Sequence, residues 1–205
     1  MKLKITRYLT PVVFLSILIS GCGDAPQLPK LARDAVILAF GDSLTHGNGV
    51  KARDSYPAIL KTLTGREVIN AGVSGEVSQA GLRRLPALLE KYHPRLLILC
   101  HGGNDILRKM DLEQMAANVK AMIELARSEN IPVVLLGVPR LGLFLKPAKQ
   151  YQDIADSTGV VFIADLIPEI LSDNSLKSDS VHPNEDGYRI MAETIYRVLQ
   201  KSGAI

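Results

Sequence analysis

Short apolar runs alternate along this chain with longer segments of helical periodicity, and this alternation most constrains the fold. The runs predicted to be strands cover residues 36–40, 67–71, 96–100, 132–137 and 160–163. Apolar residues recur at helical spacing over 56–64, 79–92 and 112–127, a loop becomes helical over 141–157, and a last helix starts near Glu185. Strands and helices that alternate in this way favour a parallel sheet with helices on both faces. We therefore predict an α/β fold with three layers, α/β/α.

Two helical segments carry a local signal. Pro86 lies inside the segment 79–92 and is expected to kink or split that helix, because proline removes an internal hydrogen bond. Asn184 precedes the last helix, where its side chain can cap the first turn. Glu185 and Asp186 follow it and suit the positive end of the helix dipole.

The first 21 residues differ from the rest of the chain. Lys2, Lys4 and Arg7 precede a short apolar run over residues 11–19, and no acidic residue occurs. The run is short for a membrane span but has the size of the hydrophobic region of a signal peptide. The letters ISGC, which end at Cys22, resemble the lipobox of bacterial lipoproteins, and this implies cleavage before Cys22 and acylation of its sulfur. An uncleaved N-terminal anchor with an incidental cysteine is the alternative.

The lipobox resemblance divides the chain into three parts. These are a signal peptide over residues 1–21, the acylated Cys22 with a proline-containing tether over residues 22–34, and one folded domain over residues 35–205. Gly23 occupies the position where an aspartate would favour retention in the inner membrane of many bacteria. We therefore expect a lipoprotein of the bacterial cell envelope that faces the periplasm, held by its N-terminal lipid, with the outer membrane preferred.

The N-terminal segment also accounts for the basic charge of the chain. The whole chain has 24 Lys and Arg against 21 Asp and Glu, a formal net charge of +3. Residues 1–21 contain three of the basic residues and no acidic one, so the remainder has 21 of each sign. The sequence contains no basic run with interleaved aromatic residues, and nucleic acid is therefore not an expected partner.

Polar residues that carry chemistry follow the predicted strands. In parallel sheets of this kind ligands bind beyond the carboxyl ends of the strands. Ser43 follows the first strand, Gly72 the second and Asn104 the third, and the pair Asp179 and His182 precedes the last helix. A serine hydroxyl needs a general base, histidine is the usual one, and the ring in turn needs an acceptor such as a carboxylate. Glycine N–H groups and an asparagine amide can stabilise a developing oxyanion.

Four blocks carry a resemblance to a known family: Gly41-Asp42-Ser43-Leu44, Gly72, Gly102-x-Asn104-Asp105 and Asp179-x-x-His182-Pro183. In this order they resemble the blocks of the SGNH hydrolases, also called the GDSL family. Residues 70–105 are similar in particular to the bacterial thioesterase-I, arylesterase and lysophospholipase branch. The resemblance implies a flavodoxin-like fold with a five-stranded parallel sheet, and hydrolysis of esters or thioesters through an acyl-serine.

The resemblance also implies a role for each matching residue. Ser43 is the nucleophile and gives its backbone N–H to the oxyanion hole, Gly72 gives a second N–H, and Asn104 gives its side-chain amide. His182 is the base and Asp179 orients it. No cofactor is implied, and no metal is expected because the four histidines are scattered without zinc-type spacing.

Other residues compete for these roles. His46 and His101 could lie near the site but lack an acid at the spacing of Asp179 and His182, so both are interpreted as residues that line the pocket. His93 precedes a strand and falls at the opposite edge.

Two further motifs have a plain interpretation. Cys100 and His101 point to opposite faces if they lie in a strand, so Cys100 is interpreted as a buried thiol. The sequence HGGN at residues 101–104 is similar to the oxyanion loop of the α/β-hydrolases. That superfamily also requires the motif Gly-x-Ser-x-Gly around its nucleophile, but residues 41–45 end in Thr45 where the motif has its second glycine. Asp105 is interpreted as stabilising its own loop.

The expected activity is that of a serine esterase. Leu141, Leu143 and Phe144 emerge after the fourth strand and are predicted to help line an acyl pocket; packing of this loop against the body is the alternative. Aryl esters, short acyl esters, lysophospholipids and thioesters are the candidate substrates. An O-acetylesterase of envelope polysaccharide or peptidoglycan is an alternative, and a non-catalytic binding lipoprotein on the same fold is an alternative of another class.

Overall fold

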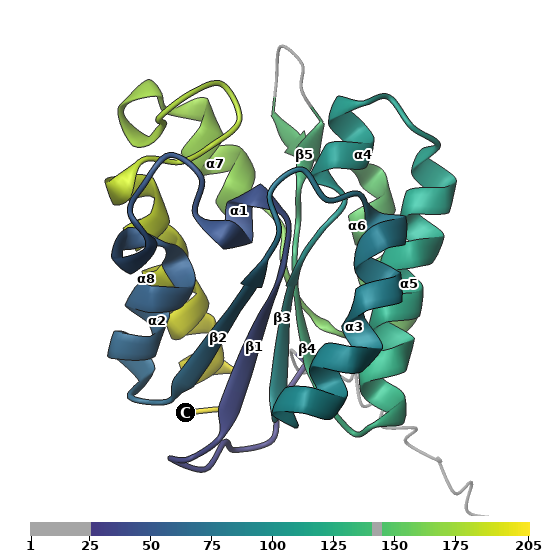
Figure 1. The fold of residues 1–205 in the computed structure, drawn as a ribbon, viewed down its shortest axis with the longest axis vertical. Helices are drawn as coiled ribbons and strands as arrows, with labels where there is room; N and C mark the ends of the chain where they lie inside the picture. Colours follow the sequence, from purple (N-terminus) through teal and green to yellow (C-terminus); the bar gives the residue numbers. More distant parts are fainter. Residues whose placement is uncertain (1–25, 141–144) are drawn as a thin grey trace, which may run out of the picture.

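The architecture is a parallel sheet of five strands between two layers of helices (Figure 1). The computed structural model describes residues 26–140 and 145–205. The strands of this sheet are β1 (Val36–Gly41), β2 (Glu67–Gly72), β3 (Leu96–Cys100), β4 (Val133–Leu136) and β7 (Val161–Ile163). Their order is β2-β1-β3-β4-β7, and every neighbouring pair is parallel. The predicted fold class and all five strands are thus confirmed, with boundaries that differ by a residue at some ends.

The longer helices divide between the two faces of the sheet. They are α2 (Tyr56–Thr64), α3 (Ser78–Tyr92), α5 (Leu112–Ser128), α6 (Lys149–Thr158) and α8 (Glu185–Lys201). Figure 1 shows α2 and α8 on one side and α3, α5 and α6 on the other. Because both faces are covered, β3 and β4 are buried along their whole length, which explains their unbroken apolar sequences.

Several short elements were not expected from the sequence. They are α1 (Ser43–His46), α4 (Gly103–Leu107), α7 (Leu166–Ser172), the 3-10 turns η1 (Ala52–Asp54) and η2 (Asn174–Leu176), and a hairpin of β5 (Pro139–Arg140) and β6 (Lys146–Pro147). Each is at most seven residues long, so none provides enough turns for a periodic apolar pattern to be recognised.

Pro86 does not split its helix, and the expectation for Asn184 is confirmed. Pro86 lies inside α3, which continues as one helix to Tyr92. The ring of Pro86 is on the exposed face, where water can satisfy the carbonyl that loses its partner. The side chain of Asn184 accepts a hydrogen bond from Gly187 N–H at 3.0 Å and caps α8.

Part of the predicted tether is bound to the domain. Leu28 N–H donates to the carbonyl of Ser202 and Leu31 N–H to that of Ala204, both at 2.8 Å. Leu31 is buried. The segment that includes these leucines therefore packs beside the end of α8, at the amino-terminal edge of the sheet, and the folded unit begins earlier than residue 35. Within the two described ranges, no helix has the length and hydropathy needed to cross a membrane.

The carboxyl ends of the three strands β2, β1 and β3 are level. Gly41 pairs with Gly72 on one side and with Cys100 on the other. A Cβ atom on Gly41 would lie 2.1 Å from the carbonyl oxygen of Cys100 and 2.4 Å from Thr45 Oγ1. Only glycine fits this contact, which lets the chain turn directly into α1.

We predict that Gly41→Ala lowers the free energy of unfolding by about 1–3 kcal/mol, because the added methyl group overlaps a backbone carbonyl that cannot move away easily. Urea denaturation followed by circular dichroism measures this change. Gly65→Asn is the control: Gly65 has a φ of +64° and open space around its Cβ position, and asparagine tolerates this conformation. Equal stability of Gly41→Ala and the wild type would contradict the prediction.

Candidate active site

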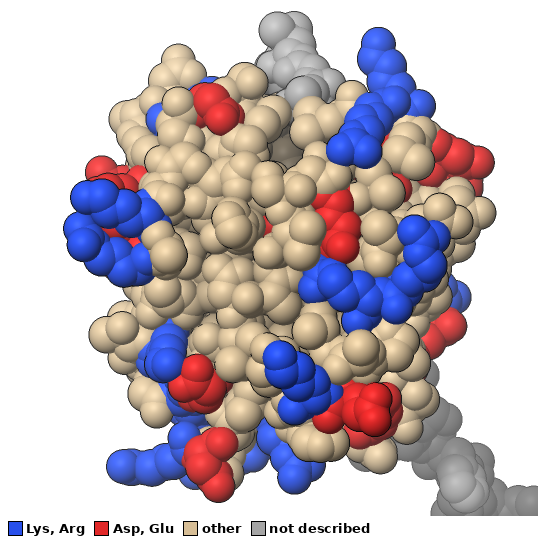
Figure 2. All heavy atoms as spheres, viewed as in Figure 1, with Lys and Arg blue, Asp and Glu red and all other residues tan. Residues whose placement is uncertain are grey.

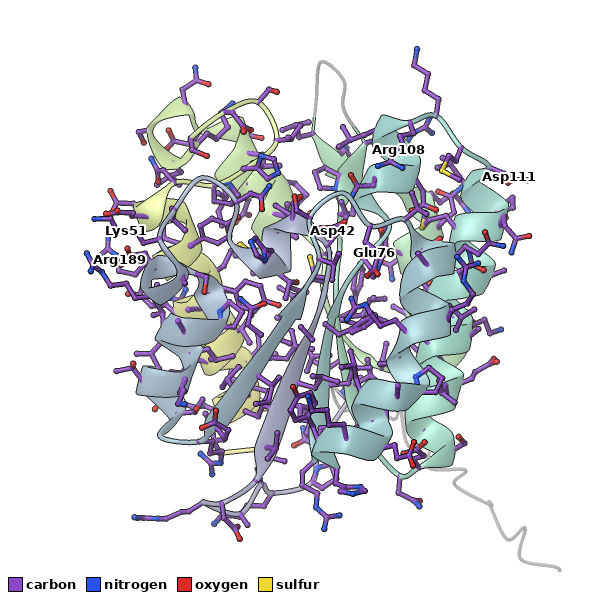
Figure 3. All side chains as sticks on the ribbon, in the orientation of Figure 1. Asp42, Lys51, Glu76, Arg108, Asp111 and Arg189 are labelled. Atoms are coloured by element: carbon purple, nitrogen blue, oxygen red, sulfur yellow. The ribbon has the colours of Figure 1, made fainter. Side chains whose placement is uncertain are left out.

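Ser43 is the first residue of α1 and lies at the carboxyl edge of the sheet. Asp42 caps this short helix, since its side chain accepts a hydrogen bond from Leu44 N–H at 3.2 Å. Burial raises the pKa of the Asp42 carboxyl above its ordinary value. The cap and the turn at Gly41 together set the direction of the Ser43 side chain. Figure 3 shows Asp42 near the upper ends of the strands.

A chain of hydrogen bonds connects Ser43 with the predicted base and its acid. His182 Nε2 is 3.0 Å from Ser43 Oγ, and His182 Nδ1 is 2.7 Å from Asp179 Oδ2. Ser43 and His182 are 139 positions apart in the sequence, whereas Asp179 and His182 are three positions apart. The structure thus brings together the serine, the histidine and the aspartate that the sequence predicted as one group.

Asp179 is held in place by its own turn. Its Oδ1 accepts hydrogen bonds from the N–H groups of Val181 and His182, at 2.8 and 2.9 Å. Partial burial alone would raise the pKa of Asp179, but the hydrogen bonds from the His182 ring and from Val181 N–H outweigh it and lower the pKa below its usual value. The ionised carboxylate favours the ring tautomer with its proton on Nδ1, which leaves Nε2 free to accept the proton of Ser43.

The structure contradicts one of the three predicted oxyanion donors. Gly72 N–H donates to the side-chain oxygen of Asn70 at 3.0 Å, so it is not free for a substrate. A Cβ on Gly72 would lie 2.1 Å from the backbone nitrogen of His46. Position 72 requires glycine because β2 packs closely against α1. This packing explains the glycine without assigning it a role in the reaction.

Gly75 has the free N–H that Gly72 lacks. It lies in a turn closed by a hydrogen bond from Glu76 N–H to the Val73 carbonyl at 3.2 Å, with a φ of +76°. Its carbonyl accepts a hydrogen bond from Arg108 at 2.8 Å, whereas its N–H meets no acceptor among the described residues. Gly75 was not predicted from the sequence. The predicted donor was Gly72, the glycine at the end of the strand, whereas Gly75 lies in the turn that follows.

The other two predicted donors are present beside Ser43. The N–H of Ser43 has no acceptor among the described residues, as expected for the first turn of a helix. Asn104 lies in the first turn of α4 and donates one amide hydrogen to the carbonyl of Glu76 at 3.0 Å. Its second amide hydrogen remains available.

A small cavity opens beside these groups. Its volume is about 30 Å³. Ser43, His182 and Asn104 form its polar part, and its apolar lining consists of Leu44, Leu107, Val138, Pro139, Leu171 and Val181. The predicted acyl-pocket residues Leu141, Leu143 and Phe144 lie outside the described residues, as do the signal peptide and Cys22.

The competing histidines lie elsewhere, and neither lines the cavity. His46 is exposed on α1, and His101 is fully buried with its Nε2 3.1 Å from Glu76 Oε2. Cys100 is a buried free thiol as predicted, and burial raises its pKa. Asp105 does not stabilise its own loop: it accepts hydrogen bonds from the N–H and hydroxyl of Ser78 at 2.8 and 2.7 Å and so ties α4 to α3.

Charges near the site are few and of mixed sign. Figure 2 shows Lys and Arg interspersed with Asp and Glu over the face seen in Figure 1, without a field of one sign. In the ranges 26–140 and 145–205, no group of three or more His, Cys, Asp or Glu side chains is arranged to hold a metal ion.

Known proteins resemble this chain over most of its length. The sequence model of the GDSL-like Lipase/Acylhydrolase family matches residues 39–190. Esterase TesA of Pseudomonas aeruginosa is 37% identical over 128 residues, which cover 60% of this chain and just under two thirds (64%) of that protein. Thioesterase 1/protease 1/lysophospholipase L1 of Escherichia coli strain K12 is 30% identical over 182 residues, which cover 83% of this chain and 86% of that protein.

A solved structure shows the same architecture. The psychrotrophic esterase EstA from Pseudoalteromonas sp., in a structure inhibited by monoethylphosphonate, superposes with a TM-score of 0.73 and 25% identity over 82% of this chain and 98% of its own. Fold, order of motifs and sequence similarity agree, and the chain belongs to the GDSL-like Lipase/Acylhydrolase family.

Proposed function

We propose that this protein is a serine esterase that hydrolyses carboxylic esters through an acyl-enzyme on Ser43. The observation that carries the proposal is the hydrogen-bond chain from Ser43 Oγ through His182 to Asp179 at the carboxyl edge of the sheet. His182 Nε2 takes the hydroxyl proton while Oγ attacks the ester carbonyl. His182 then gives this proton to the leaving alcohol, and a water molecule activated by the same ring releases the acid.

The oxyanion of each tetrahedral intermediate needs donors that are in place before the reaction. We assign this role to the N–H of Ser43, the free amide hydrogen of Asn104 and the N–H of Gly75, which replaces Gly72. All three lack a competing acceptor among the described residues, apart from the one amide hydrogen of Asn104 that Glu76 binds.

The relatives support hydrolysis over the alternatives. They are named esterase, arylesterase, and thioesterase and lysophospholipase, and one solved relative is inhibited by a phosphonate. These names do not favour a polysaccharide O-acetylesterase. A non-catalytic binding protein is not favoured either, because the serine, the base and its acid are all present and in contact.

Ser43→Ala should lower kcat for p-nitrophenyl acetate and butyrate by about 10⁴-fold or more, because the nucleophile is lost. The release of p-nitrophenolate measures this. Ser157→Ala, on the exposed face of α6, is the matched control and should keep wild-type activity. Substantial hydrolysis by a purified Ser43→Ala protein would refute the nucleophile assignment.

The small volume of the cavity, about 30 Å³, and its apolar lining support a short acyl group beside Ser43. Leu171 is a buried part of the lining and closes the cavity on the side of α7. Leu141, Leu143 and Phe144 remain predicted contributors to the acyl pocket.

We predict that the wild type prefers p-nitrophenyl acetate or butyrate to the octanoate by about 10-fold or more in kcat/KM, in line with the discrimination that small apolar pockets achieve. Leu171→Ala should reduce this preference several-fold because it enlarges the cavity. Leu199→Ala, equally buried in α8 but away from the cavity, should leave it unchanged. An unchanged preference in Leu171→Ala would show that the acyl group binds elsewhere.

We also propose that the chain is a lipoprotein acylated at Cys22 and facing the periplasm, with the outer membrane preferred. The described chain begins at Pro26, which lies against Val161 and Val198, and Leu28 is bound to Ser202 at the end of α8. This first described segment is at the edge of the sheet opposite to Ser43. This orientation supports substrates that reach the enzyme from the periplasm, since the site faces away from the anchoring membrane.

Cys22→Ala should abolish labelling by radioactive palmitate in cells and release the protein from the membrane fraction, because the acylated sulfur is missing. Hydrolysis of p-nitrophenyl acetate by the mutant should equal that of the wild type. Membrane retention of the mutant in a processed form would contradict the lipoprotein assignment.

A further inference from the structure

A buried cluster of polar side chains lies beneath the proposed oxyanion site, and the proposed reaction does not use it. It consists of Glu76, Arg84 and His101, whose side chains are 8%, 25% and 0% exposed. Arg84 Nε donates to Glu76 Oε1 at 3.0 Å, and Arg84 Nη2 and His101 Nε2 contact Oε2. Figure 3 shows Glu76 near the upper ends of the strands, on the side of α3.

The hydrogen bonds of His101 define its tautomer. The N–H of Gly102 donates to His101 Nδ1 at 3.0 Å, so Nδ1 carries no proton. The ring proton is therefore on Nε2 and is donated to Glu76. Gly81 in α3 makes room for this ring, because a Cβ there would lie 2.2 Å from Nε2.

The carboxylate of Glu76 is thus a buried charge with a full set of partners. Burial alone would raise its pKa, but the hydrogen bonds from His101 and Arg84 lower it to about 2. A buried charge that loses one partner is strongly destabilised, which makes such a cluster rigid. Arg84 is fixed in turn, since its guanidinium stacks 4.3 Å above the Phe40 ring and donates to the Ala71 carbonyl.

The backbone of Glu76 contacts the proposed site directly. Its carbonyl oxygen accepts a hydrogen bond from Asn104 Nδ2 at 3.0 Å. Because the amide group of Asn104 is planar, this contact also sets the direction of its other hydrogen. Ser78, two residues further on, is bound to Asp105, next to Asn104. These two contacts therefore hold the segment 76–78 and the start of α4 in a fixed position relative to each other.

We propose that Glu76, fixed by His101 and Arg84, is a positioning residue that aims the amide of Asn104 at the oxyanion. The inference rests on the proposed function and adds to it a polar support that does not touch the substrate. Loss of the support leaves substrate binding intact and weakens the stabilisation of the transition state. We therefore expect the effect in kcat. The proposed route is through Asn104 and not through Gly75, because the turn of Gly75 is held by backbone contacts with Val73 and by Arg108, which do not involve the Glu76 side chain.

A double-mutant cycle with Glu76→Gln and Asn104→Ala tests this coupling. With p-nitrophenyl acetate, Asn104→Ala should lower kcat by about 10²–10³-fold, the usual effect of removing one oxyanion donor. Glu76→Gln should lower kcat by about 10-fold or more with KM changed less than threefold. The double variant should match Asn104→Ala alone within threefold, since the amide that Glu76 aims is already absent.

Controls separate this role from a general loss of structure. Glu67→Gln in β2 breaks the exposed ion pair with Lys61 of α2 and should keep wild-type kcat. Circular dichroism checks folding, and if Glu76→Gln does not fold, Arg84→Lys enters the same cycle, because lysine keeps the charge but loses the two-pronged contact.

Reductions in kcat that multiply in the double variant would overturn the inference and leave the proposed function intact. A change in KM alone, or a shift of the pH profile of kcat, would also overturn it. Full activity of Asn104→Ala would overturn both the inference and the assignment of the amide as an oxyanion donor. Full activity of Ser43→Ala would instead refute the proposed nucleophile.

Discussion

The close contact between Gly41 and the end of β3 is the constraint on which the site depends. The carbonyl of Cys100 lies where a side chain at position 41 would be, so the chain passes from strand to helix at the sheet edge itself. Parallel pairing aligns Gly72 with the same position from β2. Three strands thus end at one level, and the residues that follow them meet there without a long loop.

Stability of the sheet and precision of the site come from different kinds of contact. The sheet is held by apolar burial on both faces. The segments above it are held by hydrogen bonds: Asp179 closes its own turn, Asp105 binds Ser78, and Glu76 binds Asn104. These contacts hold the reacting groups in place before the substrate arrives.

Much of the fold and of the site could be predicted from the sequence. Short apolar runs, interrupted by polar residues only in β2, predicted the five strands, and three-residue spacing predicted the contact of Asp179 with His182. The donors were harder to predict, because Gly72 and Gly75 differ only in backbone conformation and partners. His101 was interpreted as pocket lining because its partner Glu76 is 25 positions away and reaches it only after α3 packs on the sheet.

Covalent trapping of Ser43 tests the central claim most directly. The purified protein is treated with a fluorophosphonate and its mass is measured intact, and the modified residue is then located by peptide mapping. The account predicts one phosphonyl group per chain on Ser43 and none on Ser43→Ala, because His182 activates this hydroxyl alone. An unmodified wild type, or a phosphonyl group on another residue, would contradict it.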